Sequence, residues 1–190
     1  LSQKNTGGAS NHATHVAGTI GGNGAISSSA TGMAPSVNIH SYDWNYDTSE
    51  MRTAESQGVR LSNHSYGYIV GWYWNGSSWQ DYGNSYKFGS YSSGSYSYDN
   101  VVYDTDILMF KSAGNDRNDG PSSSQKDGPY DCIPPGGIAK NLITIGATND
   151  NDTMSSFSSW GPADDGRVKP DLVANGVGLY STLPNNGYGS

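Results

Sequence analysis

Short apolar runs recur along the chain, separated by polar segments with the composition of helices or turns. Four of them are VNIHSY (37–42), VRLSNHS (59–65), ILMFKS (107–112) and LITIGA (142–147). Their length and β-branched content predict buried strands. DTSEMRTAESQG, between the first two, predicts a helix, because Asp47 and Glu50 have capping-box spacing and Gly58 suits its C-terminal stop. This alternation predicts an α/β domain with a mainly parallel sheet.

In parallel sheets, ligands bind beyond the carboxyl ends of the strands, so the segments that follow strands carry the candidate chemistry. The segment NHATHVAGTI (11–20) holds two histidines three residues apart. A helical zinc site has histidines at i and i+4 with a glutamate after the first, and neither condition holds here. Metal binding is therefore the weaker interpretation. The alternative is that His12 is an acid or base at the start of a helix whose small residues pack closely on a sheet, and the rest of the chain is needed to decide.

Two segments lack strand or helix patterns. Residues 68–100 are dense in Tyr, Trp, Gly and Ser and predict an insertion or long loop. Its aromatic rings either pack on one another at the surface or form a platform that grips sugar or peptide. A second loop, between the last two predicted strands, is too rich in Gly, Pro, Asp and Asn for regular structure.

Composition narrows the classes of function. At 190 residues and 20.1 kDa, the chain suits one domain, complete or incomplete. A formal net charge of -7 argues against binding to a nucleic-acid backbone. Cys132 is the single cysteine, so no intrachain disulfide forms. No apolar stretch approaches membrane-spanning length, and the first ten residues show no signal-peptide pattern.

Four segments, in order, resemble the subtilisin-like serine proteases, or subtilases. NHATHVAGT is similar to the family motif H-G-T-H-V-A-G-T, which implies that His12 is the catalytic base and His15 a structural neighbour. FKSAGND resembles the S/A-A-G-N motif and implies that Asn115 is the oxyanion-hole asparagine. In this chemistry the imidazole takes the serine proton and passes it to the leaving amine, while the amide stabilises the oxyanion.

The other two segments concern the substrate cleft and the fold. SNHSYGY resembles the Asn-x-Ser-x-Gly segment, which implies that a peptide pairs with the main chain of Ser65, Tyr66 and Gly67. Residues 141–182 resemble the stretch that carries I-x-V-G-A, S-x-F-S-S-x-G-P and K-P-D-L-x-A-P-G. The cleft residues that the resemblance implies are Ser65, Tyr66, Gly67, Ser112, Ala113 and Gly114.

The chain departs from the family pattern in places. Ala13 replaces the usual Gly after the catalytic histidine, and Asn175 stands where the family has Pro in A-P-G. The aspartate motif D-T-G or D-S-G and the serine motif G-T-S-M-A do not occur in residues 1–190. Ser190 lacks the surroundings of a nucleophile. We therefore expect residues 1–190 to be the central portion of one three-layer α/β protease domain, inactive by itself.

The resemblance implies a protein or peptide substrate and a secreted or extracytoplasmic location. It implies no required cofactor, although structural calcium occurs in the family. GNDRNDG and NDNDT are oxygen-rich loops, but neither has EF-hand spacing, and no metal residues are assigned. One alternative is an inactive subtilase-like scaffold or a binding module that uses the aromatic insertion. Another is an interaction role through self-pairing of exposed sheet edges.

Overall fold

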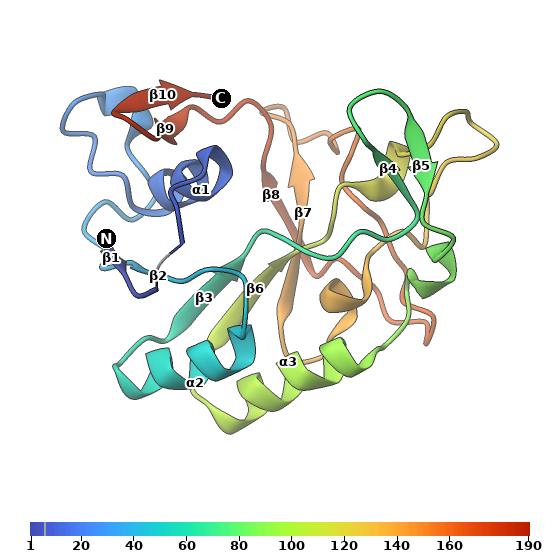
Figure 1. The fold of residues 1–190 in the computed structure, drawn as a ribbon, viewed down its shortest axis with the longest axis horizontal. Helices are drawn as coiled ribbons and strands as arrows, with labels where there is room; N and C mark the ends of the chain where they lie inside the picture. Colours follow the sequence, from blue (N-terminus) through green and yellow to red (C-terminus); the bar gives the residue numbers. More distant parts are fainter. Residues whose placement is uncertain (6) are drawn as a thin grey trace. The chain divides into compact units, whose positions relative to one another are not determined.

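Residues 47–177 are built around a sheet of four parallel strands, in the spatial order β3, β6, β7, β8 (Figure 1). The strands are β3 (Leu61–His64), β6 (Leu108–Ser112), β7 (Ile143–Thr148) and β8 (Leu172–Asn175). The first three coincide with predicted apolar runs, with β7 extending one residue further, so the mainly parallel sheet is confirmed. β8 was not predicted, because its apolar stretch is only three residues long, Leu172–Ala174, and all four of its residues are exposed.

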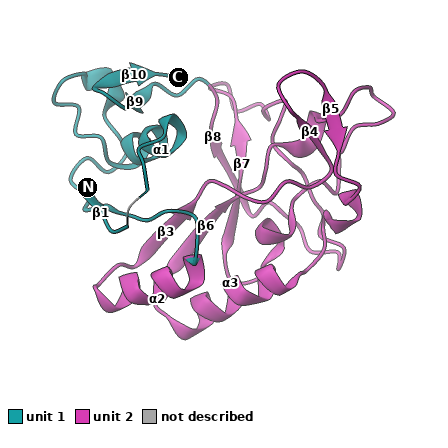
Figure 2. Ribbon diagram, viewed as in Figure 1, with its two compact units in different colours: residues 1–46, 178–190 teal, residues 47–177 magenta. Residues whose placement is uncertain are grey.

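This computed structural model describes residues 1–5 and 7–190, which divide into two units (Figure 2). The first unit holds residues 1–46 and 178–190, and the second unit holds residues 47–177. No helix in the described part of the chain is long and apolar enough to cross a bilayer.

Two helices, α2 (Asp47–Ser56) and α3 (Ser93–Asp104), pack on the sheet of the second unit. Their apolar positions meet β6 in one core cluster, in which Met51 of α2, Val101 of α3 and Met109 of β6 are buried. The strand alternates strictly at this point, since Met109 and Lys111 are buried while their neighbours are not. The predicted helix after residue 46 is therefore confirmed, and it ends two residues before Gly58, whose φ is 91°.

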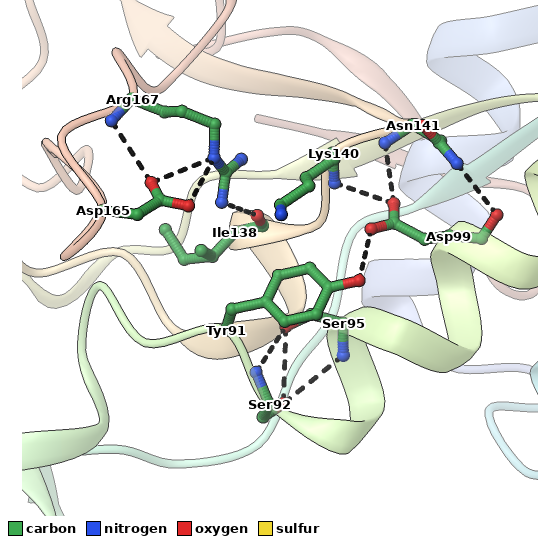
Figure 3. A network of polar contacts seen from close by, with 9 residues as sticks. All are labelled: Tyr91, Ser92, Ser95, Asp99, Ile138, Lys140, Asn141, Asp165 and Arg167. Atoms are coloured by element: carbon green, nitrogen blue, oxygen red, sulfur yellow. Dashed lines mark hydrogen bonds and ion pairs between the residues drawn. The ribbon is translucent and has the colours of Figure 1, made fainter.

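The prediction of a loop through residue 100 is wrong for residues 93–100, because they form most of α3. Ser92 caps this helix in a capping box with Ser95, a signal hidden by the serine-rich composition. The buried Asp99 carboxylate accepts hydrogen bonds from the Tyr91 hydroxyl at 2.6 Å and from the amides of Lys140 and Asn141 at 2.7 Å (Figure 3). These bonds join α3 to the loop before β7, so the segment is part of the scaffold.

The remaining aromatic segment contains a hairpin of β4 (Trp72–Trp74) and β5 (Trp79–Asp81). Its rings pack on one another edge to face, with centroids 4.9 Å apart for Tyr73 and Tyr82 and 5.7 Å apart for Trp74 and Trp79. Phe88, beyond the hairpin, is buried with Val70 and Cys132 in a second core cluster. The hairpin is thus a surface excursion anchored on both sides.

The described residues of the first unit form a two-stranded parallel pair, an α-helix and an antiparallel hairpin, besides a short 3-10 helix. Its elements are β1 (Ser2–Gln3), α1 (Asn11–Gly21), β2 (His40–Ser41), β9 (Ser181–Leu183) and β10 (Gly187–Gly189). The predicted strand at 37–42 is therefore shorter than expected. α1 lies against β9 so closely that a Cβ on Gly18 would collide with Thr182, which explains the small residues of the helix.

Short 3-10 helices connect several of these elements. They are η1 (Ser28–Ala30), η2 (Ser85–Lys87), η3 (Asp116–Asn118) and η4 (Pro135–Ile138). The loop between β6 and β7 is otherwise irregular, as its composition predicts.

Candidate active site

The turn after β6 presents Asn115 to solvent from a fixed backbone. Gly114 has a φ of 103°, a conformation that L side chains rarely adopt. A Cβ there would also lie 2.8 Å from Pro134 Cδ and 2.9 Å from Ser159 Oγ, so the position needs glycine. Ser159 holds the turn from both sides, because its amide donates to the Gly114 carbonyl and its hydroxyl accepts from the Asp116 amide, both at 3.0 Å.

Beside Asn115, the carboxyl group of Asp116 is set in an unusual electrostatic environment. Burial raises its pKa to about 7, a hydrogen bond from Ser159 opposes the rise, and the charges of Asp119 and Asp127 add to it. The carboxyl group therefore changes charge near neutral pH, directly next to the candidate oxyanion donor.

This raised pKa predicts how stability depends on pH. The folded state binds the Asp116 proton more tightly than the unfolded state, so the stabilisation is complete below about pH 4 and is lost as pH rises through 7. Replacing Asp116 with Asn should remove that loss and raise the free energy of unfolding at pH 8 by roughly 2–4 kcal/mol relative to the wild type. Urea unfolding at pH 4.5 and 8 measures it.

The matched control for this prediction is Asp106→Asn, which alters an exposed carboxylate. It should leave the free energy of unfolding at pH 8 within about 0.5 kcal/mol of the wild type, as expected for a surface substitution. If Asp116→Asn leaves the pH dependence of stability unchanged, the account of the Asp116 environment is wrong.

The second candidate segment, 65–67, follows β3 at the same edge of the sheet. β3 and β6 are parallel neighbours with His64 opposite Lys111, so the chain after His64 and the chain after Lys111 leave the sheet side by side. The segments 65–67 and 112–115 therefore leave the sheet from neighbouring strands at the same edge, and their common role in a substrate cleft stays a prediction. Both segments lie at the carboxyl ends of their strands, where parallel sheets bind ligands.

Within these segments, side chains and main chain have different surroundings. The Ala113 side chain is buried with Ile133 and Ile138, and its amide continues the ladder by donating to the Ile145 carbonyl at 2.9 Å. The Tyr66 phenol oxygen lies 2.7 Å from His64 Nδ1, inside the second unit. Both residues can therefore contact a bound peptide through their main-chain groups rather than through their side chains.

His12 lies in the first turn of α1, in the first unit, and is exposed. The helix begins there because the Ser10 hydroxyl caps it by accepting from the Ala13 amide at 3.0 Å. Ala13 has an ordinary helical position, so the glycine that it replaces is not needed. His15, one turn on, donates from Nε2 to the carbonyls of Leu179 at 2.8 Å and Gly189 at 3.2 Å. That contact gives His15 a structural role.

His12 and Asn115 belong to different units. A shared reacting carbonyl requires their side chains to lie within roughly 10 Å of each other, and this proximity stays a prediction.

Sequence reasoning missed a buried polar network beneath segment 65–67. The Tyr98 hydroxyl donates to the Asp47 carboxylate at 2.9 Å, and His64 Nδ1 lies 3.9 Å from the same carboxylate. Burial lowers the pKa of His64 to about 4, with Asp47 opposing and Lys111 adding to the shift. Asp47, whose spacing predicts a helix cap, thus takes part in this network. A lysine inside the apolar run ILMFKS was the signal that could have revealed the network.

Metal binding stays unassigned. Among the described residues, no group of three or more His, Cys, Asp or Glu side chains could hold a metal ion. In the NDNDT loop, the Asn149 amide donates to the Thr153 hydroxyl at 3.0 Å, and the same hydroxyl donates to Asn151 at 2.6 Å. These oxygens are used in turn formation.

Comparison with known proteins identifies the family. A sequence profile described as the subtilase family matches residues 2–190. The chain belongs to the subtilase family. The resemblance read from the four motifs is thereby confirmed, and so is the three-layer α/β fold class with its mainly parallel sheet.

Two curated subtilases illustrate the relationship. The chain is 37% identical over 89 residues to serine protease AprX of Bacillus subtilis, an alignment covering 43% of this chain and 18% of AprX. It is 35% identical over 81 residues to subtilisin-like protease 1 of Trichophyton verrucosum, covering 43% of this chain and 16% of that protein. The matched region is thus under a fifth of each relative.

Solved subtilase structures share the fold at low sequence identity. The prenylagaramide maturation protease PagA superposes with a TM-score of 0.70 and 18% identity, covering 99% of this chain and 60% of that one. The CspB protease of Clostridium perfringens superposes with a TM-score of 0.68 and 15% identity, covering 95% and 65%. The subtilase fold therefore extends over almost all of the chain, which in turn spans less than two thirds of these proteins.

Proposed function

We propose that this chain supplies the general base and the oxyanion donor of a serine endopeptidase. The observation that carries the proposal is the fixed Gly114 turn, which presents Asn115 at the carboxyl end of β6, the neighbour of the strand that leads into segment 65–67. The triad aspartate and serine come from segments outside residues 1–190. The substrate is a protein or peptide, and its hydrolysis takes place outside the cytoplasm.

The roles follow from the chemistry of each group. His12 takes the proton of the serine hydroxyl as it attacks the peptide carbonyl, and then donates that proton to the leaving amine. The Asn115 side-chain amide donates a hydrogen bond to the oxyanion that forms on the carbonyl oxygen. The main chain of Ser65–Gly67 holds the peptide by adding it as a further strand. No cofactor takes part, and calcium has at most a structural role.

This proposal predicts that the 190-residue chain alone does not turn over peptide amides, because a triad without its nucleophile loses covalent catalysis. A protein that joins this chain to the aspartate and serine motifs should hydrolyse casein and be labelled by a serine-directed phosphonylating reagent. Mass spectrometry of the labelled protein and a casein assay measure both outcomes.

The control is the joined protein with its motif serine replaced by alanine, which should be neither labelled nor active. Phosphonate-sensitive turnover by residues 1–190 alone would contradict the assignment of the nucleophile to another segment.

The binding-module alternative draws on the exposed rings around the β4–β5 hairpin. Tyr68, Trp74 and Tyr86 are 92%, 53% and 77% exposed, and aromatic faces of this kind bind sugars and peptides. This alternative predicts that the joined protein is folded and binds such a ligand but is neither labelled nor active. The labelling assay therefore separates the two functions.

A further inference from the structure

Lys111 of β6 is a buried lysine whose ammonium group contacts main-chain oxygens. The residue is 5% exposed and lies on the same side of the strand as Met109. Its Nζ donates to the carbonyl of Tyr66 and lies 3.5 Å from the carbonyl of His64. The ammonium is also 5.3 Å from the centroid of the Tyr66 ring. All of these contacts are to the end of β3 and the segment that follows it.

The register explains why a side chain is needed at this point. His64 is the last residue of β3 and is opposite Lys111, so the main-chain ladder between β3 and β6 ends there. Beyond it, the carbonyl of Tyr66 has no strand partner in β6, and an unpaired buried carbonyl is costly. The ammonium of Lys111 replaces the missing ladder and holds the chain beyond the end of the sheet.

Lys111 contacts the carbonyls of two alternate residues, His64 and Tyr66. This alternation determines which main-chain groups of the segment remain available on its other edge. In an extended chain, successive residues direct their main-chain polar groups to opposite edges. Lys111 engages the carbonyls of His64 and Tyr66, and an extended segment would leave those of Ser65 and Gly67 on its opposite edge. That edge is the one that a peptide strand can join.

We propose that Lys111 is a positioning residue, which fixes segment 65–67 so that its outer edge accepts the substrate main chain. This inference rests on the proposed peptidase function, and Lys111 acts through the segment without touching the substrate.

The cost of burying this lysine argues against a purely structural role. In the described part of the chain, Lys111 has no carboxylate at ion-pair distance, whereas the similarly buried Lys169 is 2.6 Å from Asp171. Buried charges are normally paired, because desolvating a lone ammonium is expensive. Burial lowers the pKa of Lys111 to about 8, and the charge of Asp47 opposes that shift.

The titration of Lys111 can be distinguished from that of the titratable groups near it. They are His64 and Tyr66, which Lys111 contacts, and Asp47, whose charge opposes its pKa shift. Glu50 and Tyr98 lie one step further away, since Glu50 acts on Tyr66 and Tyr98 bonds to Asp47. Burial lowers the pKa of His64 to about 4 and raises the pKa values of both tyrosines. Between about pH 7 and 9, these three groups therefore keep one protonation state while Lys111 loses its proton.

The test replaces Lys111 with Met in the protein that joins this chain to the aspartate and serine motifs. We expect KM for a peptide substrate to rise by about tenfold or more and kcat to change by less than about threefold, since strand pairing is weakened and the reacting groups are intact. In the wild type, KM should rise as pH passes about 8, and the variant should lack this rise.

Lys169→Met is the matched control, because it removes another buried lysine that contacts a main-chain carbonyl, that of Leu142. It should lower stability and leave KM and its pH profile unchanged. A folded Lys111→Met variant with the KM and the pH profile of the wild type would overturn the proposal.

A second measurement does not depend on catalysis. Amide hydrogen exchange of segment 64–68 in the 190-residue chain should be at least about tenfold faster in Lys111→Met than in the wild type, while exchange in β7 is unchanged. If the wild type of the joined protein shows no peptidase activity, the proposed function fails, and this exchange measurement still decides whether Lys111 holds the segment. Equal exchange in both proteins would refute that role.

Discussion

Replacing His12 with Ala, in the protein that joins this chain to the aspartate and serine motifs, should lower kcat by about 10⁵–10⁶ and leave KM within about threefold. The magnitude is the one known for the catalytic histidine of subtilisin, and it is carried over here by family membership. Without the imidazole, the serine keeps its proton and the leaving amine receives none. Steady-state hydrolysis of a peptide anilide measures both constants.

His15→Ala is the matched control for this experiment, because it removes a histidine from the same helix. His15 holds α1 to the carbonyls of Leu179 and Gly189, so its loss should lower the melting temperature. In the fraction that stays folded, kcat should fall by less than about tenfold. A larger fall in kcat for His15→Ala than for His12→Ala would reverse the assignment of the two histidines.

Replacing Asn115 with Ala should lower kcat by about 10²–10³ with little change in KM. The amide contributes when charge develops on the carbonyl oxygen, so its removal affects the transition state more than the bound substrate. Since the side chain is exposed and Ser159 fixes the turn through Gly114 and Asp116, the variant should fold normally. The same anilide assay, with circular dichroism as a check of folding, measures the effect.

Asn118→Ala provides the control for Asn115. Asn118 is also an exposed asparagine, three residues further along, and its amide donates to the main-chain carbonyl of Ser156. It should leave kcat unchanged. Equal activities of the Asn115 and Asn118 variants would show that the amide of Asn115 does not stabilise the oxyanion.

The central strands could be predicted because each lies between two neighbouring strands of the sheet, and the apolar run that this position needs is visible in the sequence. The runs that became β6 and β7 are apolar and bounded by turn residues. β8 has no apolar run of this length, and its exposed residues form a strand through pairing with β7. α3 was missed for a related reason, since serines that cap a helix resemble serines of a loop until the contacts of Asp99 are seen.

The candidate site likewise has a part that the sequence predicts and a part that it does not. Gly114 and Asn115 could be placed from a local motif, because the turn that they form depends on the conformational freedom of glycine. The contact of Lys111 with the Tyr66 carbonyl could not, because it joins residues 45 positions apart and depends on the register of β3 against β6. A charged residue within an apolar run indicates that such a contact exists, but it does not identify the partner residue.

The central claim is that His12 and Asn115 serve one reacting carbonyl beside segment 65–67. A crystal structure of the joined protein, inhibited by a peptidyl phosphonate bound to its motif serine, tests it most directly. The account predicts the Asn115 amide within about 3 Å of a phosphonyl oxygen, the His12 imidazole within about 4 Å of the serine oxygen, and the inhibitor main chain paired with Ser65 and Gly67. A phosphonate with His12 and Asn115 more than about 10 Å apart, or with another amide at its oxygen, would contradict the account.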